Sequence, residues 1–146
     1  MDTYVLLFNY KRSTLLKGDD LSQAVEETAN GRPRWNRWSG GQCSLMRGDE
    51  VFLYAQGRGP HFVFAHGSVQ SADVVIRPLP GEDEAKRMFP ILWDRVLPHA
   101  QGISEDRLMD HLPQERWRGR MGAAVLAHDD AKVLRDLWGR QVLAAN

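Results

Sequence analysis

Short apolar runs separated by turn-forming residues are the feature that most restricts how this chain can fold. Five such runs are rich in valine, phenylalanine, leucine and tyrosine, which favours β-strands over helices. The expected strands are residues 3–9, 50–55, 61–69, 72–79 and 88–97. Gly67 predicts a bulge in the third strand, and Pro90 predicts that the last strand lies at an edge or near a strand start.

Three other segments favour helices, at residues 17–31, 104–112 and 129–142. Asp19 or Asp20 is the expected N-cap of the first helix, and Ser104 is the expected N-cap of the second. In the third helix, the spacing of Leu134, Leu137 and Trp138 places these apolar side chains on one face.

These elements predict an α+β fold in one domain that spans residues 1–146. The expected architecture is a mostly antiparallel sheet of five or six strands with three peripheral helices. Such a sheet is expected to close into a small β-barrel, because closure removes exposed strand edges.

Two segments combine tryptophan with arginine and contain no acidic residue. The first is "RWNRWSGGQC", residues 34–43, which is expected to be an ordered loop or an irregular extension. The second is "RWRGR", residues 116–120. The whole chain has no net charge, with 19 basic and 19 acidic residues. The segregation therefore allows one basic face, although scattered, solvated arginines explain the pattern equally well.

Catalysis and metal binding have no support in the sequence. The five histidines match no metal-ligand spacing, and the single cysteine, Cys43, lacks the context of a nucleophile. The glycines of residues 56–60 match neither a P-loop nor a dinucleotide fingerprint. No metal or cofactor is expected, and the chain is expected to be non-catalytic by itself. The sequence has no signal peptide and no membrane-spanning run, so the expected location is cytoplasmic.

Binding of a flat ligand has more support, because four aromatic side chains occur in polar or loop-adjacent positions. Trp35 and Trp38 lie three residues apart in the first basic segment. Tyr10 follows the first strand, and Tyr54 ends the second. Such rings can stack on a nucleobase. The alternative is that these residues are ordinary core or barrel-capping side chains, whereas Trp93 and Trp138 have apolar neighbours and are expected in the core.

The sequence also resembles a known family. The segments "YVLLFNYKR", "RWSGGQ", "GDEVFLYAQGRGP" and "AHGSV" occur in an order similar to that of EVE domains, which belong to the PUA-like superfamily with YTH and ASCH domains. The part from Trp93 to Trp138 resembles the EVE branch of modification-dependent restriction endonucleases. The chain departs from the pattern at His61–Val63 and lacks a proline–tryptophan pair near Tyr10. It contains no HNH nuclease motif.

The resemblance implies a DNA-binding module that recognises a C5-modified cytosine, flipped out of double-stranded DNA into an aromatic pocket. The partner would be an HNH nuclease domain or chain. The implied pocket residues are Tyr10, Trp35, Asn36, Trp38, Ser39, Gly40 and Tyr54. The implied phosphate-binding residues are Arg34, Arg37, Arg58, Arg118 and Arg120. One alternative is an RNA-binding module like the YTH domains, and another is a small-molecule or protein-binding barrel.

Overall fold

A computed structural model describes residues 1–72, 75–77, 86–120 and 122–146 of the chain. The strands are β1 (Thr3–Asn9), β2 (Arg34–Ser39), β3 (Glu50–Gln56), β4 (Phe62–Val69), β5 (Val75–Arg77), β6 (Lys86–Val96), β7 (Ile103–Ser104) and β8 (Ala124–Val125). The helices are α1 (Asp19–Ala29), a 3-10 turn at His99–Gln101, α2 (Glu105–His111) and α3 (His128–Ala145). The predicted strand 72–79 lies partly outside the described residues.

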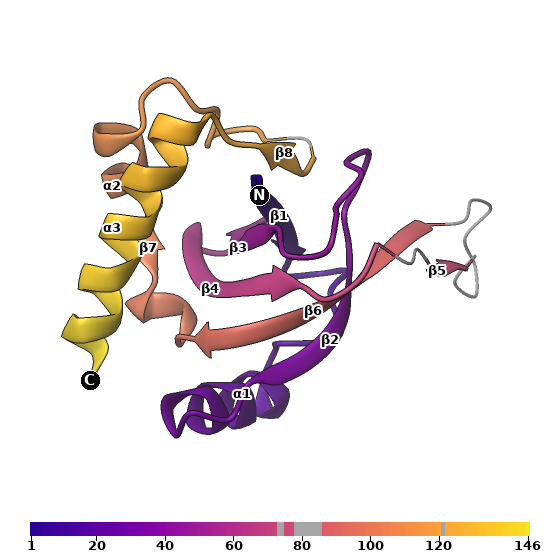
Figure 1. Cartoon of the computed structure of the whole chain (residues 1–146). Coiled ribbons are helices and arrows are strands. Elements are labelled where there is room, and N and C mark those ends of the chain that lie inside the picture. The colour runs from indigo at the N-terminus through magenta and orange to yellow at the C-terminus, as the bar shows by residue number, and fades with distance from the viewer. Residues whose placement is uncertain (73–74, 78–85, 121) are drawn as a thin grey trace.

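The strands form one curved sheet in the order β2-β6-β4-β3-β1-β8 (Figure 1). Strands β1 and β3 are parallel, and the other neighbouring pairs are antiparallel. The short strands β5 and β7 pair with β6 and β4. The α+β class is therefore confirmed, but the barrel expected from the sequence does not close. Within the described residues, β2 and β8 remain the two ends of the sheet.

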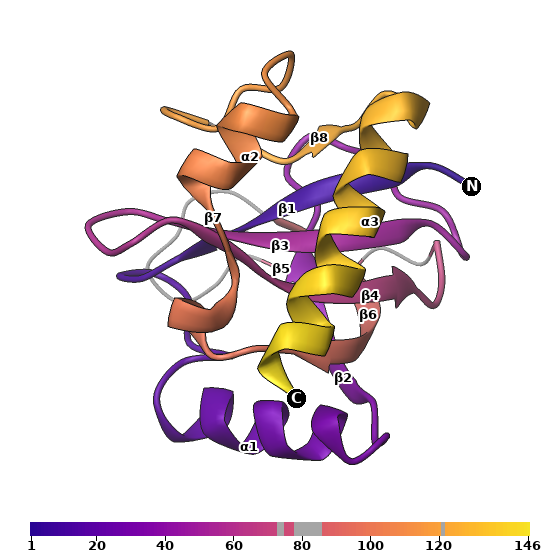
Figure 2. The same cartoon turned by 90° about the vertical axis from the view of Figure 1, so that its left-hand side faces the viewer.

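Alternation along the strands produces an apolar core on each face of the sheet. One core contains Phe8, Trp38, Phe64 and Trp93, and it is packed beside α1. The other lies under α2 and α3 and contains Phe52, Tyr54, Trp117, Leu134 and Trp138. Figure 2 shows α3 crossing the strands β1, β3 and β4, with α1 below the sheet. Trp93 and Trp138 are buried, as predicted from their apolar neighbours.

The helices follow the sequence patterns, with one difference in capping. The side chain of Ser104 accepts a hydrogen bond from the Arg107 amide and caps α2 as predicted. The N-cap of α1 is Gly18 instead of an aspartate, because Asp20 accepts the Leu16 amide in the preceding turn at 2.7 Å. No helix in the described ranges is long and apolar enough to span a bilayer.

Two predictions about individual strands need correction. Residues 34–39 form the strand β2 instead of a loop. Strand β6 is internal, between β2 and β4, although it contains Pro90. Proline lacks a backbone N–H to donate. It is tolerated there because the pairing of β6 with β4 stops at the pair Ile91–Val69 and does not include Pro90. Its carbonyl still accepts the Gln70 amide at 2.9 Å. The predicted bulge at Gly67 is confirmed by a register shift between His66 and Gly67.

Candidate functional site

A cavity of about 370 Å³ opens at the seam where the curved sheet fails to close. Strand β8 pairs with β1 only at Tyr4 and Val5, so the edge of β1 from Leu6 onwards has no strand neighbour on that side in the described structure. The end of β2 faces this free edge. The lining consists of Leu7, Asn9, Arg12, Ser13, Thr14, Leu15, Arg37, Trp38, Ser39, Gly41, Gln56, Met88, Gly122 and Ala123.

Trp38 is the aromatic wall of this cavity, and its position is fixed by several contacts. Its indole N–H donates a hydrogen bond of 2.9 Å to the carbonyl oxygen of Leu7, on the free edge of β1. Its ring stacks at 6.5 Å from Phe8 and meets Trp93 edge to face at 5.8 Å. The side chain is 6% exposed, so only a small part of the indole is available to a ligand. Because the ring is packed on Phe8 and Trp93, only this small exposed part forms a rigid aromatic wall of the cavity.

The rest of the lining is mainly neutral and polar. Asn9, Ser13, Thr14, Ser39 and Gln56 supply amide and hydroxyl groups. The Asn9 side-chain oxygen accepts the backbone amides of Lys11 and Arg12, and the Ser13 hydroxyl accepts the Asn9 amide. These bonds hold the turn after β1 against the cavity. A flat ligand with both donors and acceptors on its edge fits such a lining.

The charged groups of the cavity are all positive in the part of the chain that the structure describes. Arg12 and Arg37 line the cavity, and both side chains are exposed. The described lining contains no aspartate or glutamate. Neither arginine forms an ion pair with a described carboxylate, so both remain available to an anionic ligand. The cavity therefore combines an aromatic wall, hydrogen-bonding groups and two cations.

Three of the predicted site residues meet at this cavity: Arg37, Trp38 and Ser39. The other predicted residues of β2, which lie nearer the start of the strand, are not part of the lining. Trp35 points outward and is 52% exposed. Asn36 is buried, and its side-chain oxygen has no hydrogen-bond partner in the described structure. Gly40 serves close packing, since a Cβ there would lie 2.7 Å from the Phe89 ring.

The second basic aromatic segment does not form the opposite wall of the cavity. Tyr54 and Trp117 are buried on the other face of the sheet, with their ring centroids 5.2 Å apart. The Tyr54 hydroxyl donates to Glu105 at 2.8 Å, and burial together with this carboxylate raises the pKa of Tyr54. The prediction that Tyr54 shares a pocket with Trp38 is wrong, because the two side chains project from opposite faces of the sheet.

The remaining arginines that were predicted to bind phosphate differ in exposure and in the groups that they contact. Arg34 binds Asp20 at 2.7 Å and Glu27 at 3.2 Å on α1, which is a structural role. Arg120 is buried against the Trp117 ring, 4.9 Å from its centroid. Arg118 is exposed but binds Glu105 at 3.0 Å on the far face. Arg58 is exposed at the tip of the β3–β4 loop.

Tyr10 lies beside the cavity instead of in its lining. Its hydroxyl donates to the carbonyl oxygen of Pro60, and its ring occupies the space that a Cβ at Gly59 would need. The ring also meets Phe8 edge to face at 5.4 Å. Tyr10 therefore anchors the β3–β4 loop near the cavity, and its hydroxyl already donates a hydrogen bond to that loop.

The sequence prediction missed most of the polar lining, above all Arg12, Asn9 and Gln56. The available signal was their position, since Asn9 and Gln56 are the last residues of β1 and β3 and are directly paired. In parallel neighbouring strands, both carboxyl ends reach the same edge of the sheet. Polar residues at these two ends therefore indicated a shared site.

A second polar cluster joins α3 to the sheet, away from the cavity. His66 contacts Glu50 at 2.8 Å and Asp94 at 2.9 Å, and Arg135 binds Glu50 at 2.7 Å. Burial opposes the charge of His66, but the hydrogen bonds to Asp94 and Glu50 raise its pKa to about 9. This is an ion network, and no group of three or more His, Cys, Asp or Glu side chains in the described ranges is arranged to hold a metal.

Comparisons with known proteins support the fold. No protein-family model matches the sequence, and no curated protein matches it. Among solved structures, a hypothetical protein from Leishmania major matches with a TM-score of 0.60 at 12% identity, covering 97% of this chain and 96% of that one. Human THYN1, solved in complex with 5-methylcytosine-containing DNA, matches with a TM-score of 0.56 at 13% identity, covering 94% and 97%.

A YTH domain is also similar in fold. The Mmi1 YTH domain matches with a TM-score of 0.53 at 11% identity, covering 98% of this chain and 79% of that one. A structure of the same domain in complex with RNA matches with a TM-score of 0.50. These matches cover nearly the whole chain, and they support the α+β fold class.

Proposed function

We propose that this chain is a nucleic-acid-binding module that holds one modified base, extruded from its strand, in the seam cavity. The observation that carries the proposal is the combination in one cavity of the Trp38 wall, the neutral hydrogen-bonding groups, and Arg12 and Arg37, neither of which is paired with a described carboxylate. Stacking and edge hydrogen bonds must together offset the few kcal/mol that base extrusion costs. In this proposal the two arginines bind the phosphates on either side of the extruded nucleotide.

The proposed ligand is a C5-modified cytosine in double-stranded DNA. This choice rests on the fold shared with human THYN1, whose structure contains 5-methylcytosine DNA, and on the family resemblance of the sequence. The apolar lining residues, Leu7, Leu15, Met88 and Ala123, provide surface for a methyl substituent. One buried methyl group contributes about 0.8 kcal/mol, so we expect roughly a four-fold preference for the methylated base.

The direct test compares duplexes that differ only at cytosine C5, with fluorescence anisotropy as the measurement. The set consists of one unmodified, one 5-methyl and one 5-hydroxymethyl duplex of the same sequence. We expect tighter binding to at least one modified duplex, and equal affinity for all three contradicts the proposal. A competition with single-stranded RNA of matched sequence tests the alternative. A preference for RNA would favour a YTH-like function, which the fold shared with the RNA-bound Mmi1 domain supports.

Trp38→Phe is expected to weaken binding of the preferred duplex by about 10-fold, because the smaller ring stacks less and loses the hydrogen bond to Leu7. Anisotropy titrations measure this loss, and circular dichroism checks that the variant is folded. The matched control is Trp138→Phe, a buried tryptophan on the other face of the sheet. An equal loss of binding in both variants would indicate a general effect of stability instead of stacking in the cavity.

We also propose that the module supplies the specificity of a modification-dependent restriction system. The chain itself then performs no chemistry, and an HNH nuclease in another domain or chain cuts the DNA. Binding to modified DNA and cleavage are separable in this scheme. Cleavage of modified plasmid by the native protein with its partner, and its absence with this chain alone, is the expected result.

A further inference from the structure

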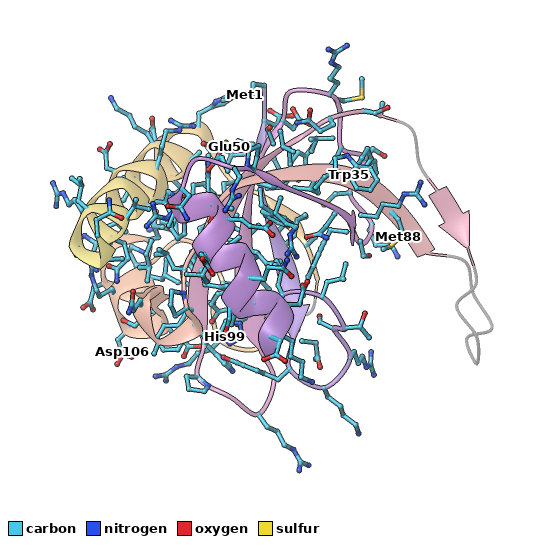
Figure 3. All side chains as sticks on the ribbon, turned by 90° about the horizontal axis from the view of Figure 1, so that it is seen from below. Met1, Trp35, Glu50, Met88, His99 and Asp106 are labelled. Atoms are coloured by element: carbon cyan, nitrogen blue, oxygen red, sulfur yellow. The ribbon has the colours of Figure 1, made fainter. Side chains whose placement is uncertain are left out.

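The outward face of β2 carries an exposed tryptophan that the cavity does not use. Trp35 is 52% exposed, and its neighbour across the sheet is Leu92 of β6. Helix α3 crosses β1, β3 and β4 (Figure 2), and its C-terminal end reaches β6, where Arg95 binds Asn146, whereas β2 lies beyond β6 in the sheet order. In Figure 3, Trp35 and Met88 lie at the end of the molecule that is remote from α3. The indole is therefore a flat apolar surface at an open edge of the sheet.

Arg37 connects this tryptophan with the cavity. Its guanidinium carbon lies 5.7 Å from the centroid of the Trp35 ring, within cation–π range. The same side chain lines the cavity next to Trp38. One cation thus lies between the buried indole of the cavity and the exposed indole outside it.

The charge around Trp35 favours an anionic, aromatic ligand over an apolar protein surface. Arg37 is beside the ring, and Arg12 lies at the same cavity. The acidic residue of β6 that shares this outward face, Asp94, is already bound to His66. A nucleotide offers both a base for the indole and a phosphate for the guanidinium.

We propose that Trp35 and Arg37 form a second nucleotide subsite, which stacks an unpaired base adjacent to the one in the cavity. This inference rests on the proposed function and extends it to the form of the substrate. Two neighbouring nucleotides then leave the duplex stack together, so the module opens double-stranded DNA locally at two positions when it binds the modified cytosine. Arg37 holds the phosphate between the two bases.

The test uses two probes that differ in length. The first is 5-methyldeoxycytidine monophosphate, and the second is a DNA trinucleotide with 5-methylcytosine in the centre. Indole N–H resonances in ¹⁵N NMR spectra, assigned with Trp→Phe variants, report on each tryptophan. We expect the Trp38 resonance to shift with both probes and the Trp35 resonance to shift only with the trinucleotide.

Trp35→Ala is expected to weaken trinucleotide binding by about 10-fold and to leave mononucleotide binding unchanged. Val125→Ala is the matched control, since Val125 is also 52% exposed but lies on β8. The subsite is refuted if Trp35→Ala binds the trinucleotide as tightly as the wild type, or if it loses both probes equally. If the wild type binds neither these probes nor the modified duplexes, the proposed function fails and the subsite fails with it.

Discussion

Reversing the charge of both Arg12 and Arg37 is expected to weaken nucleic-acid binding by about 100-fold at physiological salt. These side chains are the two cations of the cavity lining, and neither is paired with a described carboxylate. Arg12→Glu with Arg37→Glu replaces two phosphate contacts with two repulsive charges. The slope of log Kd against log salt should fall by about two, because each lost phosphate contact changes the slope by roughly one.

The matched control for this double variant is Lys132→Glu with Arg140→Glu, which makes the same change in net charge. Both residues are exposed on α3, and neither belongs to the described lining of the cavity. Anisotropy titrations at several salt concentrations measure both double variants. If the α3 variant loses as much affinity as the cavity variant, the binding is a non-specific attraction to the whole surface, and the cavity is not the binding site.

Replacing Glu50 with alanine is expected to destabilise the fold by about 3–5 kcal/mol. The Glu50 carboxylate, whose side chain is 9% exposed, accepts hydrogen bonds from His66, Arg135 and Thr3. Removing it leaves the charge of His66 without its buried partner, and it removes the ion pair that links Arg135 of α3 to the sheet. Urea or guanidinium denaturation measures the loss. Asp94→Asn is the control, because Asp94 is 56% exposed and a surface partner contributes about 1 kcal/mol or less.

The same network predicts how stability depends on pH. The pKa of His66 is raised from 6.5 to about 9, so its contribution is complete below 6.5 and is lost as the pH rises through 9. The pKa of Glu50 is lowered from 4.5 to about 2 by its hydrogen bonds, despite burial. Its contribution is complete above 4.5 and is lost as the pH falls through 2. The wild type should lose stability progressively between about pH 6.5 and 9, and Glu50→Ala should show a much smaller loss.

The local sequence patterns predicted most of the secondary structure. Runs of β-branched and aromatic residues correspond to β1, β3, β4 and β6, and the capping and apolar patterns correspond to α1, α2 and α3. Strand β2 was missed because two of its three inward positions carry polar residues, Arg34 and Asn36, beside Trp38. Arg34 is tolerated there because Asp20 and Glu27 of α1 neutralise it. Those carboxylates belong to a different segment, so the pattern of β2 alone contains no sign of them.

The candidate site was predicted as a segment but not as a set of residues. The acid-free segment at residues 34–43 does supply Arg37, Trp38 and Ser39 to the cavity. The two tryptophans in it look equivalent in the sequence, yet one lines the cavity and the other is exposed. Tyr54 and Trp117 lie beside polar or basic residues in the sequence, which favoured a binding surface. In the structure both are buried under the helices.

The sequence by itself determined most of the elements, the α+β class and the short segment where aromatic rings meet arginines, because these depend on neighbouring residues. Only the tertiary structure decided which rings and cations face one cavity. The face on which a strand residue lies depends on the register with strands distant in the sequence, and one step changes the face. The cavity itself exists because β8 pairs with only two residues of β1 and leaves the sheet open beside Trp38.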